Sequence, residues 1–320
     1  ASTPGDQHAR IAAAIDAMQP AGSTNGQAGI ELAYSEAQQG FINNGVNRVI
    51  LATDGDFNVG QIGIDALKDE IADKRKSGIA LSTLGFGEGN YNDALAVQLA
   101  DVGNGSHHYI DSLDEARKVL VDEMSSTLLT IARDVKIQIE FNPARVSEYR
   151  LIGYVKRMLR REDFNNDAID AGEIGAGANV TALYEITPAG SDAARIDPLR
   201  YGSHPAGDGN RKELAWLRLR YKLPGTDHSR LIERAVTDSD QSGTPSRRLR
   251  FAAAVAAFAE SLRGAKYLDN YTLPQIATLA RGARGDDPHG YRASFVRLVE
   301  LAEGLRTLEP QSATKTVTER

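Results

Sequence analysis

Two oxygen-bearing side chains stand where a parallel α/β fold would gather a ligand. Asp54 comes just after the predicted strand of residues 46–52, in which Val49, Ile50 and Leu51 form an unbroken apolar run. Thr24 lies in a glycine-rich loop ahead of a helical pattern. Ligands of open parallel sheets bind beyond the carboxyl ends of the strands, so the two side chains can meet at that edge. A few carboxylate and hydroxyl oxygens suit Mg²⁺, Mn²⁺ or Ca²⁺ better than Zn²⁺. The sequence therefore predicts a divalent-metal site with Thr24 and Asp54 as ligands.

Each of these residues also has an ordinary structural explanation. A threonine just ahead of a helix is a common N-cap, because its hydroxyl accepts a hydrogen bond from a backbone N–H of the first turn. An aspartate followed by glycine, as in Asp54-Gly55, is a common turn residue whose carboxylate bonds its own backbone. Taken one at a time, neither Thr24 nor Asp54 separates the metal site from these alternatives.

The first part of the chain alternates helices with short strands. Apolar residues at helical spacing are followed each time by an apolar run too short for a helix. This alternation is typical of right-handed crossovers and of a parallel, Rossmann-like sheet covered on both faces. A continuous apolar strand is accordingly expected to be buried on both sides. The predicted helices are residues 6–19, 27–40, 62–77, 91–103 and 112–133, and the predicted strands are residues 46–52, 79–84 and 107–110.

The pattern changes after residue 133. Apolar and polar residues alternate over 135–141, 181–186 and 214–221, which predicts half-buried antiparallel strands joined by long loops. Helical spacing returns at residue 247, where Phe251, Val255 and Phe258 form a stripe predicted to face a core. The sequence thus predicts a parallel α/β domain, a β-rich domain, a helical segment packed on the β-rich domain and a disordered tail. Their predicted bounds are residues 1–133, 134–245, 246–308 and 309–320.

Composition excludes several classes of function. The net charge is −6, and the lysines and arginines are scattered, which argues against a nucleic-acid partner. The chain has no cysteine, so disulfides, thiolate zinc sites and thiol catalysis are excluded. No apolar run approaches the roughly 20 residues that a transmembrane helix needs.

A glycine-rich loop follows the strand predicted at residues 79–84. Gly85, Gly87 and Gly89 alternate there, but this spacing differs from the G-x-G-x-x-G of dinucleotide-binding folds. The acidic residue that those folds place at the end of a later strand is also missing from its position. The pattern therefore favours a turn that lines the rim of the predicted metal site.

A second loop begins like the calcium-binding loop of an EF-hand. Asp163, Asn165 and Asp167 occupy its first three ligand positions. Ala168 then replaces the required glycine, and Ile174 stands in place of the final glutamate. A solvated acidic turn is the favoured interpretation, and calcium binding at this loop stays open as the alternative.

Signals of catalysis are absent from the sequence. His107 and His108 are neighbours on a predicted strand, so they point to opposite faces, cannot share one metal ion and are expected at the strand surface. No Gly-x-Ser-x-Gly elbow and no recognisable pair of acidic residues occurs. The chain is therefore not predicted to be an enzyme.

The strings PAGSTNG at residues 20–26 and VILATDG at residues 49–55 closely resemble the von Willebrand factor type A domain. The resemblance covers residues 6 to about 133. It implies that Thr24 and Asp54 are ligands of a metal-ion-dependent adhesion site. The strings at residues 47–58, 84–93, 163–167 and 213–221 resemble the bacterial YfbK-like branch, and this closer similarity spans nearly the whole chain.

One departure from that family pattern shapes the expectations. The family's Asp-x-Ser-x-Ser motif, which follows its first strand, does not occur in its place here. We therefore expect an N-terminally truncated domain whose first strands are missing, so that strand 46–52 is an open edge prone to aggregation. Thr24 and Asp54 alone supply too few of the about six oxygens that Mg²⁺ prefers. Metal binding by this chain is accordingly expected to be weak or absent.

The resemblance implies a divalent-metal-dependent protein-binding module for adhesion or scaffolding. An acidic residue of the protein partner would complete the coordination of Mg²⁺, Mn²⁺ or Ca²⁺. The alternative is a hydrolase or nucleotide-using enzyme on a Rossmann-like sheet, which the fold alone permits. A structural envelope component without metal dependence is a third possibility. A place in the cell envelope or periplasm is favoured by the resemblance alone.

Overall fold

The computed structural model describes residues 2–19, 25–43, 45–54, 63–87, 89, 91–153, 158–169, 171–196 and 212–308. The chain divides into two compact units, each assembled from separate stretches of sequence. Unit 1 consists of Ala1–Ile137, Leu159–Asn179 and Leu219–Ile232, and unit 2 consists of Gln138–Met158, Val180–Arg218 and Glu233–Arg320.

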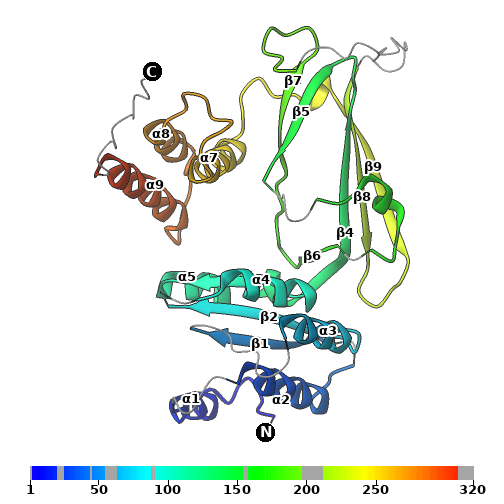
Figure 1. Cartoon of the computed structure of the whole chain (residues 1–320), viewed down its shortest axis with the longest axis vertical. Helices are drawn as coiled ribbons and strands as arrows, with labels where there is room; N and C mark the ends of the chain where they lie inside the picture. The colour runs from blue at the N-terminus through cyan, green and yellow to red at the C-terminus, as the bar shows by residue number, and fades with distance from the viewer. Residues whose placement is uncertain are drawn as a thin grey trace, which may run out of the picture. The chain divides into compact units, whose positions relative to one another are not determined.

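Unit 1 contains a three-stranded parallel sheet in the order β1-β2-β3 (Figure 1). The strands are β1 (Asn47–Thr53), β2 (Ile79–Phe86) and β3 (His107–Ile110). The helices of this region are α1 (His8–Asp16), α2 (Gly26–Gln39), α3 (Ile64–Arg75), α4 (Asp93–Val102), α5 (Leu113–Arg117), the π-helix η1 (Lys118–Asp122) and α6 (Met124–Leu128). The predicted parallel α/β sheet is therefore confirmed.

One face of this sheet packs against α2, α3 and α4. Each helix contributes two buried residues four positions apart, a spacing that puts both side chains on the same side of a helix. These pairs meet Val49, Ile79 and Leu81 of the sheet. The six helical residues are Ile30, Tyr34, Leu67, Ile71, Leu95 and Leu99. The helical periodicity in the sequence thus specified this side of the core.

The opposite face is covered unevenly. Leu84 and Ile110 are buried there against Val119 of η1. On β1, by contrast, Ile50 is 46% exposed, so the expectation of burial on both faces was wrong for this strand. Among the described residues β1 pairs with β2 alone, and an edge strand has fewer neighbours to cover it. The tendency to aggregate through this edge stays a prediction.

The predicted helix over residues 112–133 was wrong in its last residues, from 130 onward. The helical path passes from α5 through η1 to α6, and the strand β4 (Thr130–Phe141) begins soon afterwards. Thr130 pairs with Gly175, and Ala132 with Ile174, both on β6 (Gly172–Gly175). Tertiary pairing with a distant strand therefore outweighs the local helical pattern.

The later strands form antiparallel pairings. Strand β4 lies in a four-stranded sheet of order β6-β4-β8-β9, with β8 at Glu213–Lys222 and β9 at Ser229–Thr237. Strands β5 (Val146–Ile152) and β7 (Leu183–Pro188) form a separate antiparallel pair. Strands were predicted where β4, β7 and β8 occur, whereas β5, β6 and β9 were not predicted. Short 3₁₀ turns occur at Arg161–Asn165 (η3) and Asp238–Asp240 (η4).

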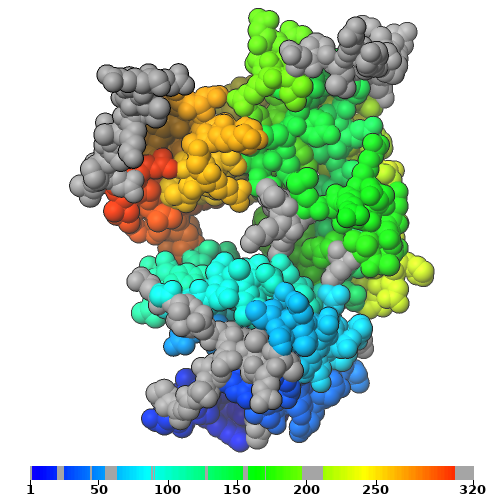
Figure 2. Space-filling view, viewed as in Figure 1, coloured from blue at the N-terminus to red at the C-terminus, as the bar shows by residue number. Residues whose placement is uncertain are grey.

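Three C-terminal helices form a small core within unit 2. They are α7 (Arg247–Leu262), α8 (Leu273–Ala283) and α9 (Tyr291–Leu308). Phe258 of α7 is buried as predicted, but Val255 is 40% exposed and Ala254 takes its place in the core. Figure 2 shows α9 at the molecular surface, and its outer side exposes Leu298, Leu301 and Leu305. In the described part of the chain, no helix combines the length and the apolar character needed to cross a membrane.

Candidate functional site

Asp54 lies at the carboxyl end of β1, directly after Thr53. Its side chain is exposed, and it makes no hydrogen bond or ion pair with another described residue. Thr53 is paired with Gly85 of β2, which in turn is paired with Tyr109 of β3. Asp54 therefore stands one residue beyond a row that crosses all three strands, at the edge where parallel sheets bind ligands.

The glycine turn after β2 packs against Asp54. Gly87 has a φ of +75°, a conformation that side-chain-bearing residues rarely adopt. A Cβ atom on Gly87 would lie 3.4 Å from the backbone oxygen of Asp54 and 3.9 Å from its Cβ. Gly87 is thus favoured by its backbone conformation, and a side chain at this position would contact the candidate metal ligand.

Aromatic side chains stand behind this turn. The Tyr109 hydroxyl donates a hydrogen bond to the carbonyl oxygen of Gly87. The Tyr91 ring lies over Gly85, where an added Cβ would come within 2.2 Å of the Tyr91 hydroxyl. The rings of Tyr91 and Tyr109 are 5.5 Å apart between centroids. Gly85 therefore makes room for an aromatic pair at the sheet edge.

The hydroxyl of Tyr91 is buried and has no hydrogen-bond partner among the described residues. Burial raises the pKa of Tyr91 to about 12, and the charge of Asp93 and the neighbouring Tyr109 add to this effect. A buried hydroxyl without a partner costs stability, because it gives up its hydrogen bonds to water. Tyr91 and Tyr109 are therefore adjacent phenols of which one is hydrogen-bonded and the other is not.

His107 links the sheet to the start of α4. Its Nδ1 lies 2.9 Å from the Thr83 hydroxyl, and its Nε2 lies 3.0 Å from a carboxylate oxygen of Asp93. The Thr83 hydroxyl also donates to the carbonyl oxygen of Ala96, so Thr83 connects His107 with α4. The His107 side chain is only 12% exposed, so the expectation of a surface histidine was wrong.

His108 occupies the other face of the sheet, as predicted. Burial lowers the pKa of its imidazole, and the nearby positive charges of His107 and Lys118 lower it further. Its Nε2 is buried without a hydrogen-bond partner in the described structure. The two neighbouring histidines therefore have separate surroundings and do not form one metal site.

The second predicted ligand, Thr24, lies outside the described residues. The N-cap of α2 is Asn25, whose side-chain oxygen accepts a hydrogen bond of 3.2 Å from the Ala28 N–H. Asn25 thus occupies the N-cap position of α2, and the two interpretations of Thr24 stay predictions. No group of three or more His, Cys, Asp or Glu residues that could hold a metal ion occurs in the part of the chain that the structure describes. Among the described residues, Asp54 is thus not part of such a group, and its carboxylate oxygens are of the type that Mg²⁺ prefers as ligands.

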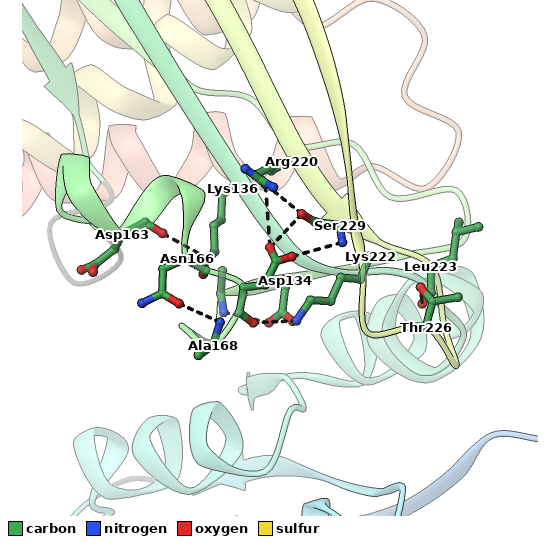
Figure 3. A network of polar contacts seen from close by, with 12 residues as sticks. Asp134, Lys136, Asp163, Asn166, Ala168, Arg220, Lys222, Leu223, Thr226 and Ser229 are labelled. Carbon is green, nitrogen blue, oxygen red and sulfur yellow. Dashed lines mark hydrogen bonds and ion pairs between the residues drawn. The ribbon is translucent and has the colours of Figure 1, made fainter.

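The acidic loop at residues 163–167 encloses lysine side chains (Figure 3). The Lys136 ammonium donates to the carbonyl oxygens of Asp163, at 3.3 Å, and of Asn166. The Lys222 ammonium donates to the carbonyl oxygen of Asp167 at 2.8 Å and pairs with Asp134 at 2.7 Å. Lys136 and Lys222 are 4% and 7% exposed. Burial lowers the pKa of Lys136, against the opposing charges of Asp134 and Asp167.

The side chains of this loop do not converge on a common point. Asn165 accepts a hydrogen bond from Arg220 at 2.9 Å, and Asp167 accepts one from the Ser229 hydroxyl at 2.7 Å. The Asp163 carboxylate points away from the rest of the network (Figure 3). Lysine ammonium and arginine guanidinium groups thus donate hydrogen bonds to loop oxygens of the kind that coordinate the ion in a calcium-binding loop. This arrangement favours the structural interpretation of the loop.

The sequence analysis did not identify Tyr91 and Tyr109 at the candidate site. A tyrosine at a strand end is common, and its hydroxyl partner lies about twenty residues away on another loop. The two buried lysines were also missed, because a lysine that alternates with apolar residues is ordinarily exposed on a strand. The sequence did point to Gly87, because the glycine-rich loop was expected to line the rim of the predicted metal site.

Comparison with known proteins agrees with these features. Residues 2–123 match the von Willebrand factor type A domain, and residues 126–305 match the family described as "Uncharacterized protein YfbK, C-terminal". The chain is 52% identical over 306 residues to "Uncharacterized protein YfbK" of Escherichia coli (strain K12), which covers 95% of this chain. The match covers 53% of the Escherichia coli protein, so the chain spans about half the length of that relative.

Solved structures with similarity to the chain are more distant. A von Willebrand factor type A protein from Catenulispora acidiphila is 16% identical, with a TM-score of 0.37, over 83% of this chain and 61% of that protein. The human COPII-coat protein Sec24c is 10% identical, with a TM-score of 0.33, over 80% of this chain and 36% of that protein.

Proposed function

Because the chain belongs to the YfbK family, in which a von Willebrand factor type A domain precedes a YfbK-type C-terminal region, we propose that it is a divalent-metal-dependent protein-binding module. Domains of type A are commonly metal-dependent interaction modules and are generally not enzymes. The proposed contact lies at the carboxyl edge of the β1-β2-β3 sheet. An acidic residue of the protein partner would approach the metal there.

The exposed carboxylate of Asp54 is the observation that supports this proposal most. It stands beyond the last paired row of the sheet and is engaged by no other described side chain. A carboxylate kept free at the ligand-binding edge suits a hard cation such as Mg²⁺ or Mn²⁺. The bound ion would supply positive charge between Asp54 and the carboxylate of the partner. Thr24 is the second proposed ligand.

Two protein oxygens leave about four positions of Mg²⁺ to water or to the partner. We therefore expect this chain alone to bind Mg²⁺ and Mn²⁺ weakly, with dissociation constants above the micromolar range. Isothermal titration measures this directly. Sub-micromolar binding by the chain alone would contradict the small ligand set.

Partner binding gives the decisive test of the proposed function. The protein is used to capture partners in Mg²⁺ and in chelator, and Asp54→Ala is compared with Asp111→Ala. Asp111 is the matched control, because it is an exposed aspartate just after β3 and accepts a hydrogen bond of 2.9 Å from the Ser112 hydroxyl.

We expect chelator and Asp54→Ala to abolish capture of the same partner, and Asp111→Ala to leave it unchanged. Capture that survives both chelator and Asp54→Ala would refute the proposal. That result would favour a structural component without metal dependence.

A further inference from the structure

We infer that Tyr109 is a positioning residue that holds Asp54 in place at the sheet edge through the carbonyl group of Gly87. The inference rests on the proposed function, because it concerns the residue proposed to bind the metal. It assigns a role to Tyr109 of β3, whereas the proposed metal ligand Asp54 follows β1.

The hydrogen bond of Tyr109 crosses from the third strand to the turn after the second. Tyr109 is paired with Gly85 through the sheet, yet its hydroxyl reaches Gly87, two residues further along the chain. The sheet ladder that holds β2 ends at Phe86, so the hydrogen bond acts on the first residue beyond the strand. Tyr109 therefore restrains a part of the turn that strand pairing does not reach.

Gly87 passes this restraint to Asp54. Its φ is positive, and the space on its Cβ side borders Asp54, because a Cβ added at Gly87 would lie 3.4 Å from the Asp54 backbone oxygen. The Asp54 side chain makes no hydrogen bond to another described residue, so its direction depends on its own backbone. A shift of Gly87 therefore changes the backbone that lies beside Asp54.

The Tyr109 ring is itself held in place. It packs against Tyr91, and Tyr91 is stacked on His107 with 6.3 Å between centroids and 17° between planes. The His107 ring is fixed by its contacts with Thr83 and Asp93. A phenol whose ring cannot turn freely loses little entropy when its hydroxyl forms a hydrogen bond, which makes the contact with Gly87 an effective restraint.

The two tyrosines provide a matched pair of variants. Tyr109→Phe removes the hydroxyl that bonds Gly87 and keeps the ring. Tyr91→Phe makes the same chemical change one ring away, where the hydroxyl has no hydrogen-bond partner among the described residues. Any effect of losing a phenol from this cluster should appear in both variants, whereas loss of positioning should appear in Tyr109→Phe alone.

Amide hydrogen exchange in the metal-free chain is the first measurement. Loss of one hydrogen bond should speed local opening at Gly87 and Asp54 by about two- to tenfold in Tyr109→Phe. Exchange at these amides in Tyr91→Phe should match that of the parent. Equal exchange rates in the parent and Tyr109→Phe would overturn the inference.

Titration with Mn²⁺ is the second measurement, on the same variants. The affinity should fall by a similar factor, about two- to tenfold, in Tyr109→Phe and stay unchanged in Tyr91→Phe. If the parent and Tyr109→Phe bind Mn²⁺ equally, the inference fails while the proposed metal site stands. If neither the unmodified chain nor Tyr109→Phe binds Mn²⁺ measurably, the exchange data alone decide whether Tyr109 restrains Asp54.

A second pair of variants perturbs the turn while Tyr109 stays intact. Gly87→Ala and Gly89→Ala both place a side chain on a residue with positive φ, at +75° and +110°. Only the Cβ at residue 87 would contact Asp54, because a Cβ on Gly89 has no neighbour within 4 Å among the described atoms. Weaker Mn²⁺ binding in Gly87→Ala than in Gly89→Ala supports the inference, and an equal loss in both contradicts it.

Discussion

The buried ion pair between Lys222 and Asp134 provides a sensitive test of the network around the acidic loop. The Lys222 ammonium lies 2.7 Å from the carboxylate, and the two side chains are 9% and 12% exposed. Lys222→Met keeps most of the side-chain volume and removes the charge. It removes the Lys222 charge beside the buried Asp134 carboxylate and the hydrogen bond that Lys222 donates to the carbonyl oxygen of Asp167.

The expected cost follows from this burial. Removing one partner of a buried ion pair lowers the free energy of unfolding by about 3–5 kcal/mol, because the remaining charge stays desolvated. Asp134 keeps the hydrogen bond that it accepts from the Ala171 N–H at 3.2 Å, which places the expectation near the lower end, at about 3 kcal/mol. Lys222→Met combined with Asp134→Asn should recover most of this loss. Asparagine also tolerates the positive φ of 50° at residue 134.

Urea denaturation followed by circular dichroism measures these differences, with hydrogen exchange in β4 and β8 as a local probe. Lys76→Met is the matched control. Its ion pair with Asp73 is as short, at 2.6 Å, but the two side chains are 73% and 74% exposed. Such surface pairs contribute little. Equal stability of Lys222→Met and Lys76→Met would refute the claim that Lys222 is a buried, paired charge.

Two further predictions concern buried or hydrogen-bonded groups. The pKa of Asp167 is lowered from 3.8, and the largest cause is the hydrogen bond from the Ser229 hydroxyl. The ionised carboxylate therefore contributes its full stabilisation above about pH 4, and this contribution is lost as the pH falls through the lowered pKa. Ser229→Ala should therefore be less stable than the parent near neutral pH, with a difference that shrinks in acid, and a difference that grows in acid would contradict this sign. Tyr34 is 2% exposed, and its hydroxyl has no hydrogen-bond partner in the part of the chain that the structure describes. Burial, followed by the charge of Glu70, raises the pKa of Tyr34 to about 12. Tyr34→Phe should leave the free energy of unfolding unchanged or raise it by about 1 kcal/mol, and a loss in thermal or urea denaturation would show that the hydroxyl is satisfied after all.

Periodic apolar residues were sufficient to predict the parallel α/β part. Pairs such as Ile30 and Tyr34, or Leu67 and Ile71, are four residues apart in sequence and share a helix face, so the information needed to place them is local. The site prediction used the same kind of information, because the end of an apolar strand locates Asp54 at the ligand edge. Asp54 lies there in the structure, whereas its role in metal binding stays a proposal.

Contacts between distant residues decided the remainder. Thr130 and Ala132 sit in a helical pattern, but they pair with β6 more than forty positions later in the chain. Lys136 and Lys222 alternate with apolar residues as exposed strand residues do, and they are buried because the loop at 163–167 folds over them.

The sequence by itself thus determined which segments form helices and parallel strands in the first part of the chain, and where their ligand edge lies. The tertiary structure alone decided which charges are buried and which phenol reaches Gly87. A hydrogen bond between residues far apart in sequence leaves no periodic signal in either segment, because neither partner's own neighbours reflect it.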